Sequence, residues 1–213
     1  RNNFLKRSLT WNENNVLDGA RHITIAGHIV YITTPDALVV LDLNDPLSPQ
    51  LLNRIKMNDP RASALQFRYL LVTDRDGVKI FDATSPNNIK SSPVAAVPLN
   101  DARKVYIART YAYVAAGKDG LAIIDVKNPE KPFINQIFTA DGKINDAQDV
   151  IVGSTNASLF AYVADGRNGL KVIQLTAPDT QPRYYGFSPE PKPQLIAWWK
   201  TEYPALSLSK GLD

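Results

Sequence analysis

The chain has 213 residues, and 44% of them are apolar, which is enough for a substantial buried core. Its 24 Lys and Arg residues against 21 Asp and Glu leave a formal charge of +3. That excess is too small and too dispersed for nucleic-acid binding, which needs basic residues clustered on one face. Cysteine is absent, which excludes disulfides, thiolate metal sites and covalently attached haem within this segment.

No apolar run approaches the ~18 residues of a membrane-spanning helix, so no membrane span is expected. The chain begins with Arg1 and shows no signal peptide at its start. We therefore expect a mature form or a piece of a longer protein. Residues 1–17 are expected to hold the last strand of a preceding structural unit plus a connection, because residues 2–11 resemble the fourth apolar run of the units that follow.

Four related units follow this segment. Each contains two apolar runs, a turn, a third apolar run, a turn marked by Pro, and a fourth run. The Pro anchors are Pro46, Pro86, Pro129 and Pro178, at spacings of 40, 43 and 49 residues. An insertion at residues 154–160 explains the longest spacing. The predicted units are 18–57, 58–99, 100–143 and 144–201, followed by a C-terminal tail at 202–213.

Runs of four to seven residues rich in Val, Ile, Tyr and Leu, bounded by Gly, Asp, Asn and Pro, predict β-strands. Four short strands in every unit of about 40 residues is the spacing of a β-propeller blade. The third strand is apolar on nearly consecutive positions, which predicts that neighbouring sheets cover both of its faces. Its second position holds Val39, Lys79, Ala122 and Lys171, and we expect the two Lys side chains to place their ammonium groups in water.

The unit at residues 101–132, DARKVYIARTYAYVAAGKDGLAIIDVKNPEKP, resembles the LVIVD repeat along nearly its whole length. The resemblance extends over about residues 18–201. It departs from the pattern where Gln174 replaces Asp, where the first unit lacks Gly before its third strand, and where the second unit lacks its second Pro. The resemblance implies an all-β fold, a β-propeller of four-stranded blades that is partial or part of a longer chain.

The resemblance also implies a bacterial or archaeal protein that is exported or lies at the cell surface. It assigns no single activity. Modules similar to this family occur beside multihaem cytochromes, so association with a haem protein is one expectation for the partner. The chain itself is expected to carry no cofactor.

Three carboxylates end the third strands, namely Asp42, Asp82 and Asp125. Asp at such a position accepts hydrogen bonds from the backbone of the following turn, so we predict structural turn residues. The short loops at residues 74–77, 117–120 and 165–169 are predicted to be hairpin turns in which Gly supplies a positive φ. They are too short for a calcium loop, which needs six or more oxygen ligands.

A second set recurs just before the innermost strand of each unit, where it is expected to ring one mouth of the central channel. Its members are Asp18 with Arg21, Asp59 with Arg61, Asp101 with Arg103, and Asp146 with Gln148. Such a ring can bind an anionic or polar ligand through bidentate Arg contacts. Alternatively, each Arg pairs with an Asp of its own or the adjacent blade. Recurrence in every unit favours the second interpretation, because contacts between blades must recur.

The remaining candidates are aromatic residues and histidines. Trp198 and Trp199 are adjacent on one predicted strand and must point to opposite faces, so one is expected in the core and the other at a partner interface. Tyr184 and Tyr185 lie in a long connection and are further interface candidates. His22 and His28 lack Cys or other His ligands nearby and are expected to be surface or hydrogen-bonded residues, with no metal site.

No catalytic signature is present: the chain has no nucleophile elbow, zinc-protease helix, Walker loop or dinucleotide-binding turn. The leading hypothesis is a non-enzymatic scaffold or protein-binding module of an exported or cell-surface assembly. One alternative is a propeller domain or subunit that accompanies a multihaem electron-transfer cytochrome. Another is a propeller-type metal-dependent hydrolase or lactonase, which needs acidic or His side chains to converge in the channel.

Overall fold

The structure is a computed structural model, and it describes residues 9–155, 157–179, 181 and 186–210. It is all-β, with four antiparallel sheets of four strands each. We call these sheets blades 1 to 4. Their strands are β1 (His22–Ala26), β2 (Ile29–Thr33), β3 (Ala37–Asp42) and β4 (Gln50–Lys56); β5 (Ala62–Gln66), β6 (Tyr69–Asp74), β7 (Gly77–Asp82) and β8 (Ala95–Pro98); β9 (Lys104–Ala108), β10 (Tyr111–Ala115), β11 (Leu121–Asp125) and β12 (Phe133–Phe138); β13 (Asp149–Thr155), β14 (Ser158–Ala164), β15 (Leu170–Thr176) and β16 (Gln194–Trp199).

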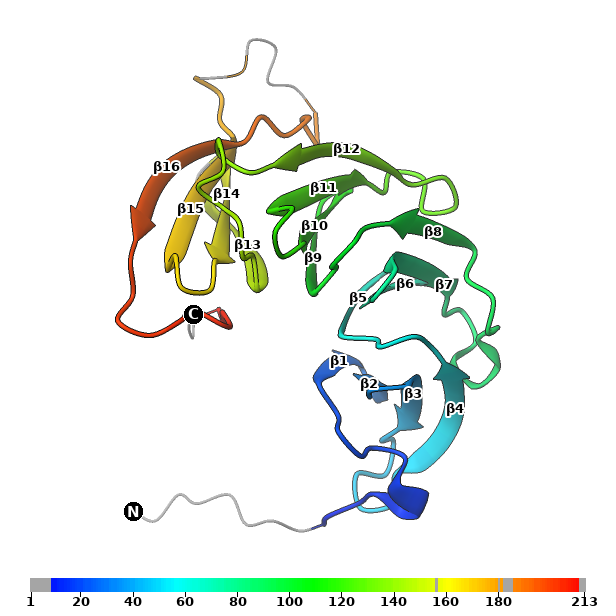
Figure 1. Cartoon of the computed structure of the whole chain (residues 1–213). Coiled ribbons are helices and arrows are strands. Elements are labelled where there is room, and N and C mark those ends of the chain that lie inside the picture. The colour runs from blue at the N-terminus through cyan, green and yellow to red at the C-terminus, as the bar shows by residue number, and fades with distance from the viewer. Residues whose placement is uncertain (1–8, 156, 180, 182–185, 211–213) are drawn as a thin grey trace, which may run out of the picture.

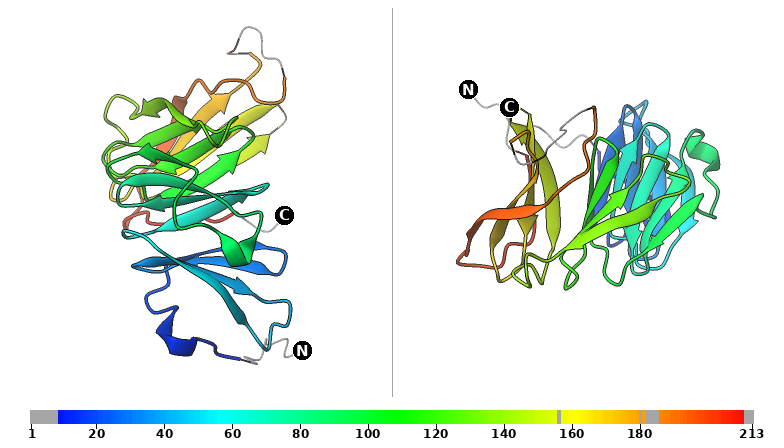
Figure 2. Two further views of the ribbon diagram at one scale, coloured as in Figure 1. Left: turned by 90° about the vertical axis from the view of Figure 1, so that its right-hand side faces the viewer. Right: turned by 90° about the horizontal axis from the view of Figure 1, so that it is seen from above.

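The blades follow one another around an open arc, with β1, β5, β9 and β13 on the inner side and β4, β8, β12 and β16 on the outer side (Figure 1). Within each blade every strand pairs with the next strand along the chain. Figure 2 shows that successive sheets pack face to face. This arrangement is that of consecutive propeller blades and confirms the predicted fold class.

The hydrophobic core lies between the blades. One buried cluster joins blades 1 and 2 and includes Leu38 and Phe81, and another joins blades 3 and 4 and includes Tyr113 and Ile173. A third lies between blades 2 and 3. Because both faces of an internal blade are covered, the third strand is buried at consecutive positions, as in Leu121–Ile124 of β11. The consecutive apolar pattern of the sequence is explained by this packing.

The N-terminal segment covers the face of blade 1 that points away from blade 2. Trp11 and Leu17 pack against a buried cluster that includes Val30 and Val39. Residues 9–17 contain a 3-10 turn, η1 (Glu13–Asn15), and no strand; the first eight residues lie outside the described part. A second 3-10 turn, η2 (Pro86–Asn88), follows β7. In the described part of the chain, no helix has the length and apolar character needed to cross a membrane.

The last blade absorbs its insertion by lengthening a hairpin. β13 and β14 each have seven residues and pair from Asp149↔Ala164 to Thr155↔Ser158. The hairpin turns before the third strands follow the prediction, since Gly77, Gly120 and Gly169 all have positive φ.

Candidate functional site

The predicted ring residues meet as a chain of charges along one mouth of the arc. Arg21 pairs with Asp59 of the next blade, Arg61 pairs with Asp101, and Arg103 Nη1 lies 3.0 Å from Asp146 Oδ1. We call this set the mouth ladder. Its members are Arg21, Asp59, Arg61, Asp101, Arg103, Asp146 and Gln148.

Each middle carboxylate of the mouth ladder also binds the arginine of its own blade. Arg61 Nη2 lies 3.2 Å from Asp59 Oδ2, and Arg103 Nη2 lies 2.7 Å from Asp101 Oδ2. In blade 4 the neutral Gln148 takes the place of the arginine, and its Nε2 donates to Asp146 Oδ1 at 2.7 Å. Each arginine of the two complete rungs therefore bridges two carboxylates, one in its own blade and one in the next.

The arginines alter the acidity of these carboxylates. A hydrogen bond from Arg21, assisted by Arg61, holds the pKa of Asp59 below its usual value although burial opposes the shift. At Asp101 burial is the largest influence and raises the pKa, but hydrogen bonds from Arg103 and Arg61 together outweigh it and the net pKa is lowered. Both carboxylates are therefore held in the charged form that the pairing requires.

Two glycines permit this close packing at the mouth. Gly117 and Gly166, both at positive φ, lie in hairpin turns against the mouth carboxylates of their own blades. A Cβ on Gly117 would lie 2.2 Å from Asp101 Oδ2, and one on Gly166 would lie 2.0 Å from Asp146 Oδ2. Backbone at these two positions therefore needs Gly both for its conformation and for space.

The first member of the predicted set stands apart. Asp18 accepts a hydrogen bond from Asn12 Nδ2 at 2.7 Å, and within the described residues no arginine contacts it. The ladder guanidinium groups are thus engaged by the protein's own carboxylates. This geometry supports the structural interpretation of the set, and a ligand for it stays a prediction.

A pair of charges that the sequence did not predict lies in the hairpins of blades 2 and 4. Asp74, at the end of β6, is fully buried and binds Lys79 of β7. Asp165, just after β14, is also fully buried and lies 3.9 Å from Lys171 Nζ of β15. The expectation that the ammonium groups lie in water is wrong for Lys171, whose side chain is only 7% exposed. The Lys79 side chain is 25% exposed, and its ammonium also lies 3.6 Å from the exposed Asp76 carboxylate. The Lys171 ammonium donates to Asn168 O at 3.0 Å and faces the buried Asp165 carboxylate, whereas the Lys79 ammonium binds the buried Asp74 carboxylate directly.

The two buried carboxylates hold different parts of the backbone. Asp74 Oδ1 accepts from the N–H groups of Asp76 and Gly77 in its own hairpin. Asp165 Oδ1 accepts from Asn145 at 3.1 Å and from Asp146 at 2.7 Å, which lie on the connection into blade 4. Burial raises the pKa of Asp165, and these backbone hydrogen bonds and Lys171 oppose the rise.

His22 is half-buried on β1 and joins two blades. Its Nδ1 accepts from Ser63 N–H of blade 2 at 3.2 Å, so the neutral ring carries its proton on Nε2. Burial, with a smaller effect of the Lys104 charge, lowers the pKa of His22 to about 4. His28 lies exposed in the β1–β2 turn. Within the described residues, no three His, Cys, Asp or Glu side chains gather as a metal site would require.

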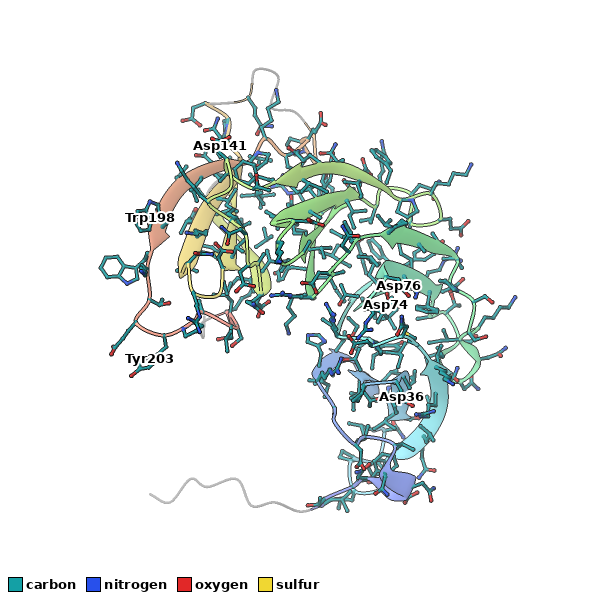
Figure 3. All side chains as sticks on the ribbon, in the orientation of Figure 1. Asp36, Asp74, Asp76, Asp141, Trp198 and Tyr203 are labelled. Carbon is teal, nitrogen blue, oxygen red and sulfur yellow. The ribbon has the colours of Figure 1, made fainter. Side chains whose placement is uncertain are left out.

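The tryptophan pair lies on β16, the outermost strand of blade 4. The expectation that one of them enters the core is wrong, because Trp198 is 62% exposed and Trp199 is 73% exposed. The ammonium of Lys171 lies 5.5 Å from the ring of Trp198. Figure 3 places Trp198 at the same end of the arc as Tyr203, which is 74% exposed. Tyr184 and Tyr185 lie outside the described residues.

The strand-end carboxylates act as predicted. The Oδ1 atoms of Asp42, Asp82 and Asp125 each accept from the backbone N–H two residues on, at 2.7–2.9 Å. Their chemistry is that of turn formation.

Comparison with protein families identifies the chain. The LVIVD repeat model matches residues 19–56, 100–139 and 145–178, which together exceed half of the chain. The chain therefore belongs to the LVIVD repeat family, whose repeats form β-propeller folds. Blade 2 lies outside the matched segments but has the same four-stranded topology. No curated protein matches the chain.

Several solved structures share the fold at low identity. A functionally unknown protein from Desulfotomaculum acetoxidans DSM 771 has 11% identity and a TM-score of 0.61, over 88% of this chain and 60% of that one. The computationally designed Ika8 protein has 14% identity and a TM-score of 0.52, over 73% of this chain and 46% of that one. The designed Ika4 protein has 13% identity and a TM-score of 0.50, over 72% of this chain and 89% of that one. The chain thus spans less than two thirds of the Desulfotomaculum and Ika8 structures, and these likenesses concern the fold alone.

Proposed function

We propose that this chain is a non-enzymatic protein-binding module of an exported or cell-surface assembly, and that Trp198 and Tyr203 contact its protein partner. The exported location rests on the family resemblance. The observation that carries the binding role is the exposure of these two large aromatic side chains at one end of the arc (Figure 3). Trp and Tyr are enriched among the residues that dominate binding energy at protein interfaces.

The indole of Trp198 is suited to such a contact because it is held in place. Its strand pairs with β15 at Lys171↔Trp198, and the Lys171 ammonium lies against the ring. An aromatic side chain that is already ordered loses little conformational entropy on binding. The contrast with the mouth favours this end of the arc, because the ladder charges already bind one another.

The test is a comparison of proteins captured from the native host by the wild-type chain and by variants. Trp198→Ala combined with Tyr203→Ala is expected to lose specific partners at least tenfold, since interface aromatics of this kind contribute about 2 kcal/mol or more. Phe67→Ala is the matched control, because Phe67 is 93% exposed on the turn between β5 and β6, far from this end. Equal capture by all three proteins would overturn the proposal.

The proposed location has its own test. Protease added to intact host cells is expected to cleave the chain if it lies at the surface. If the added protease leaves the chain intact both in whole cells and in the periplasmic fraction, the proposed location is contradicted. The proposed interface is not affected by that result.

A further inference from the structure

At two of the seams, hydrogen bonds join a blade to the segment that leads into or begins the innermost strand of the next blade. Ahead of blade 4, Gly117 and Ala147 form an isolated antiparallel bridge, with N–H···O distances of 3.1 and 2.9 Å in the two directions. Ahead of blade 2, Ser63, the second residue of its innermost strand, donates its N–H to the first residue of β1, His22. Contacts of this kind place the innermost strand of the following blade.

The C-terminal segment makes both contacts with blade 4. Gly166, which corresponds to Gly117 in its hairpin, forms the same antiparallel bridge to Ala205, at 3.1 and 2.9 Å. Three residues later, Leu208 donates its N–H to Asp149 Oδ2 at 2.9 Å. Asp149 is the first residue of β13, as His22 is of β1, so this bond corresponds to the one between Ser63 and His22. Figure 1 shows the chain turning back from β16 to the inner side of the arc.

Within the part of the chain that the structure describes, no sheet covers the far face of blade 4. The residues of β14 and β15 alternate between buried and half-buried, with Lys171 and Ile173 buried and Leu170 and Val172 half-buried. In β11, which has a blade on each side, all four residues from Leu121 to Ile124 are buried. Alternation of this kind is typical of a sheet that is covered on one face only.

We infer that residues 204–210 are the innermost strand of a fifth blade, and that the open face of blade 4 accepts three further antiparallel strands of the LVIVD type paired with that strand. The seam between blades 4 and 5 then continues the three seams already described. The seam between blades 4 and 5 has no ion pair of the mouth ladder, because Gln148 stands in place of the arginine of blade 4 and Pro204 stands in place of the aspartate of blade 5. Trp199, which pairs with Leu170 on this open face, becomes a contact within the seam.

A second copy of the chain fits this face less well. It would bring its own innermost strand, β1, to a position that residues 204–210 already fill. Next to residues 204–210, the sheet would continue with a second strand. We therefore assign the open face to a blade whose first strand is residues 204–210 and whose other three strands pair with it in turn.

The test is an extension of the full chain by one blade. Ala205 corresponds to Ala102, so the first residue added after Asp213 corresponds to Tyr111. A copy of residues 111–139 is therefore added directly after Asp213. The added strands are expected to raise the midpoint of thermal unfolding by about 4 °C or more. They are also expected to shift the emission of Trp199 to shorter wavelength, a change that Trp199→Phe abolishes.

The control is the same extension in a chain carrying Leu208→Pro, which removes the N–H that binds Asp149. The gain in midpoint is expected to disappear in this background. An extension that leaves the midpoint and the Trp emission unchanged in the wild-type background overturns the inference. A concentration-dependent dimer of the unextended chain in light scattering, abolished by Ile23→Asp on the exposed face of β1, also overturns it and assigns the face to a second copy. The inference does not depend on the proposed function, since Trp198→Ala with Tyr203→Ala is expected to leave the gain in midpoint intact.

Discussion

Blades 2 and 4 differ from blades 1 and 3 at two positions that meet inside the hairpin. At the end of the second strand blade 2 has Asp74, and just after the second strand blade 4 has Asp165. In the third strand these blades have Lys79 and Lys171. Blade 3 has Ala116 and Ala122 at these positions, both fully buried. Blade 1 has Thr34, whose hydroxyl donates to Ala37 O, together with Val39. The charges are present together or absent together.

This co-occurrence follows from the cost of burying a single charge. An unpaired ammonium or carboxylate inside a protein is strongly unfavourable, whereas two opposite charges placed together offset much of each other's cost of burial. In blade 2 the two groups are hydrogen-bonded, and in blade 4 they lie 3.9 Å apart. The backbone of the hairpin accommodates either solution. The residue types at the two positions therefore go together in the four blades, and we expect a change at one of them to be tolerated best when the other changes with it.

The largest effect is expected from breaking the pair in blade 4. Lys171→Met leaves the buried Asp165 carboxylate without its cation and is expected to lower the free energy of unfolding by about 3 kcal/mol. Urea unfolding followed by circular dichroism measures the change. The matched control is Asp165→Asn combined with Lys171→Met, which keeps an oxygen for Asn145 and Asp146 N–H and is expected to lie within about 1 kcal/mol of wild type. A double variant as unstable as the single one would refute the idea of a coupled unit.

A somewhat smaller effect is expected from introducing half of the pair into blade 1. Val39→Lys places an ammonium at a fully buried position and is expected to cost about 2 kcal/mol. Adding Thr34→Asp supplies the carboxylate found in blades 2 and 4 and is expected to restore part of that loss. The readout is again urea unfolding, and an unchanged or larger loss in the double variant would show that blade 1 cannot adopt the charged arrangement.

The buried Asp165 and the ladder carboxylate Asp59 are expected to affect stability in opposite directions as pH changes. Burial raises the pKa of Asp165, so its carboxyl binds a proton more tightly in the folded protein than in the unfolded chain, where the pKa of Asp is about 3.9. The contribution to stability is therefore fully present below that value and is lost as pH rises through the folded pKa. Asp59 has the opposite sign: its pKa is lowered, so its contribution is present above the ordinary value and is lost as pH falls through the folded pKa.

We therefore expect the free energy of unfolding of Asp165→Asn, relative to wild type, to increase as pH rises through the folded pKa of Asp165. For Asp59→Asn we expect it to decrease as pH rises from the folded to the unfolded pKa of Asp59. Urea unfolding at a series of pH values from 3 to 7 compares the variants. Parallel curves for the two variants would contradict the assignment.

The smallest effect concerns the strand-end carboxylate that blade 4 lacks. Asp125→Gln gives blade 3 the residue of blade 4, removes the charge and moves the acceptor for Lys127 N–H one carbon further from the backbone. A loss of about 0.5–1 kcal/mol is expected, because the turn is exposed and water replaces the bond. Thermal unfolding detects the shift, and Asp125→Asn, whose side chain still reaches the N–H group, is expected to lose less.

The blades and their turns were predictable because their signals are local. Apolar runs, Gly at the hairpins and Asp before Pro all act within a few residues, and Asp42 and Asp82 form the turns that the sequence predicted. The recurrence of Asp and Arg favoured contacts between blades, and the structure shows those ion pairs. The pairing depends only on the regular stacking that a repeat implies.

The buried pairs and the tryptophans depended on tertiary packing. Lys79 and Lys171 suggest solvent when they are considered one strand at a time, although Asp74 and Asp165 a few residues earlier offered a signal that only the comparison of units reveals. The exposure of both Trp198 and Trp199 follows from the outermost position of β16 in its blade, since Phe133 and Ile137 of the outermost strand β12 are also exposed, and no residue of the strand itself encodes that position. The role of residues 204–210 was hidden for a related reason: the segment shares few residue types with the other innermost strands, and only its backbone contacts repeat.

The mouth ladder also has a consequence for the folding rate. Its contacts between blades join residues 38 to 43 positions apart, which is one repeat length. The loop that must close before each rung forms is therefore set by the repeat, whatever the number of blades. Assembly of such an arc can begin at any blade and proceed to its neighbours, so its kinetics should depend on the weakest seam more than on the total length of the chain.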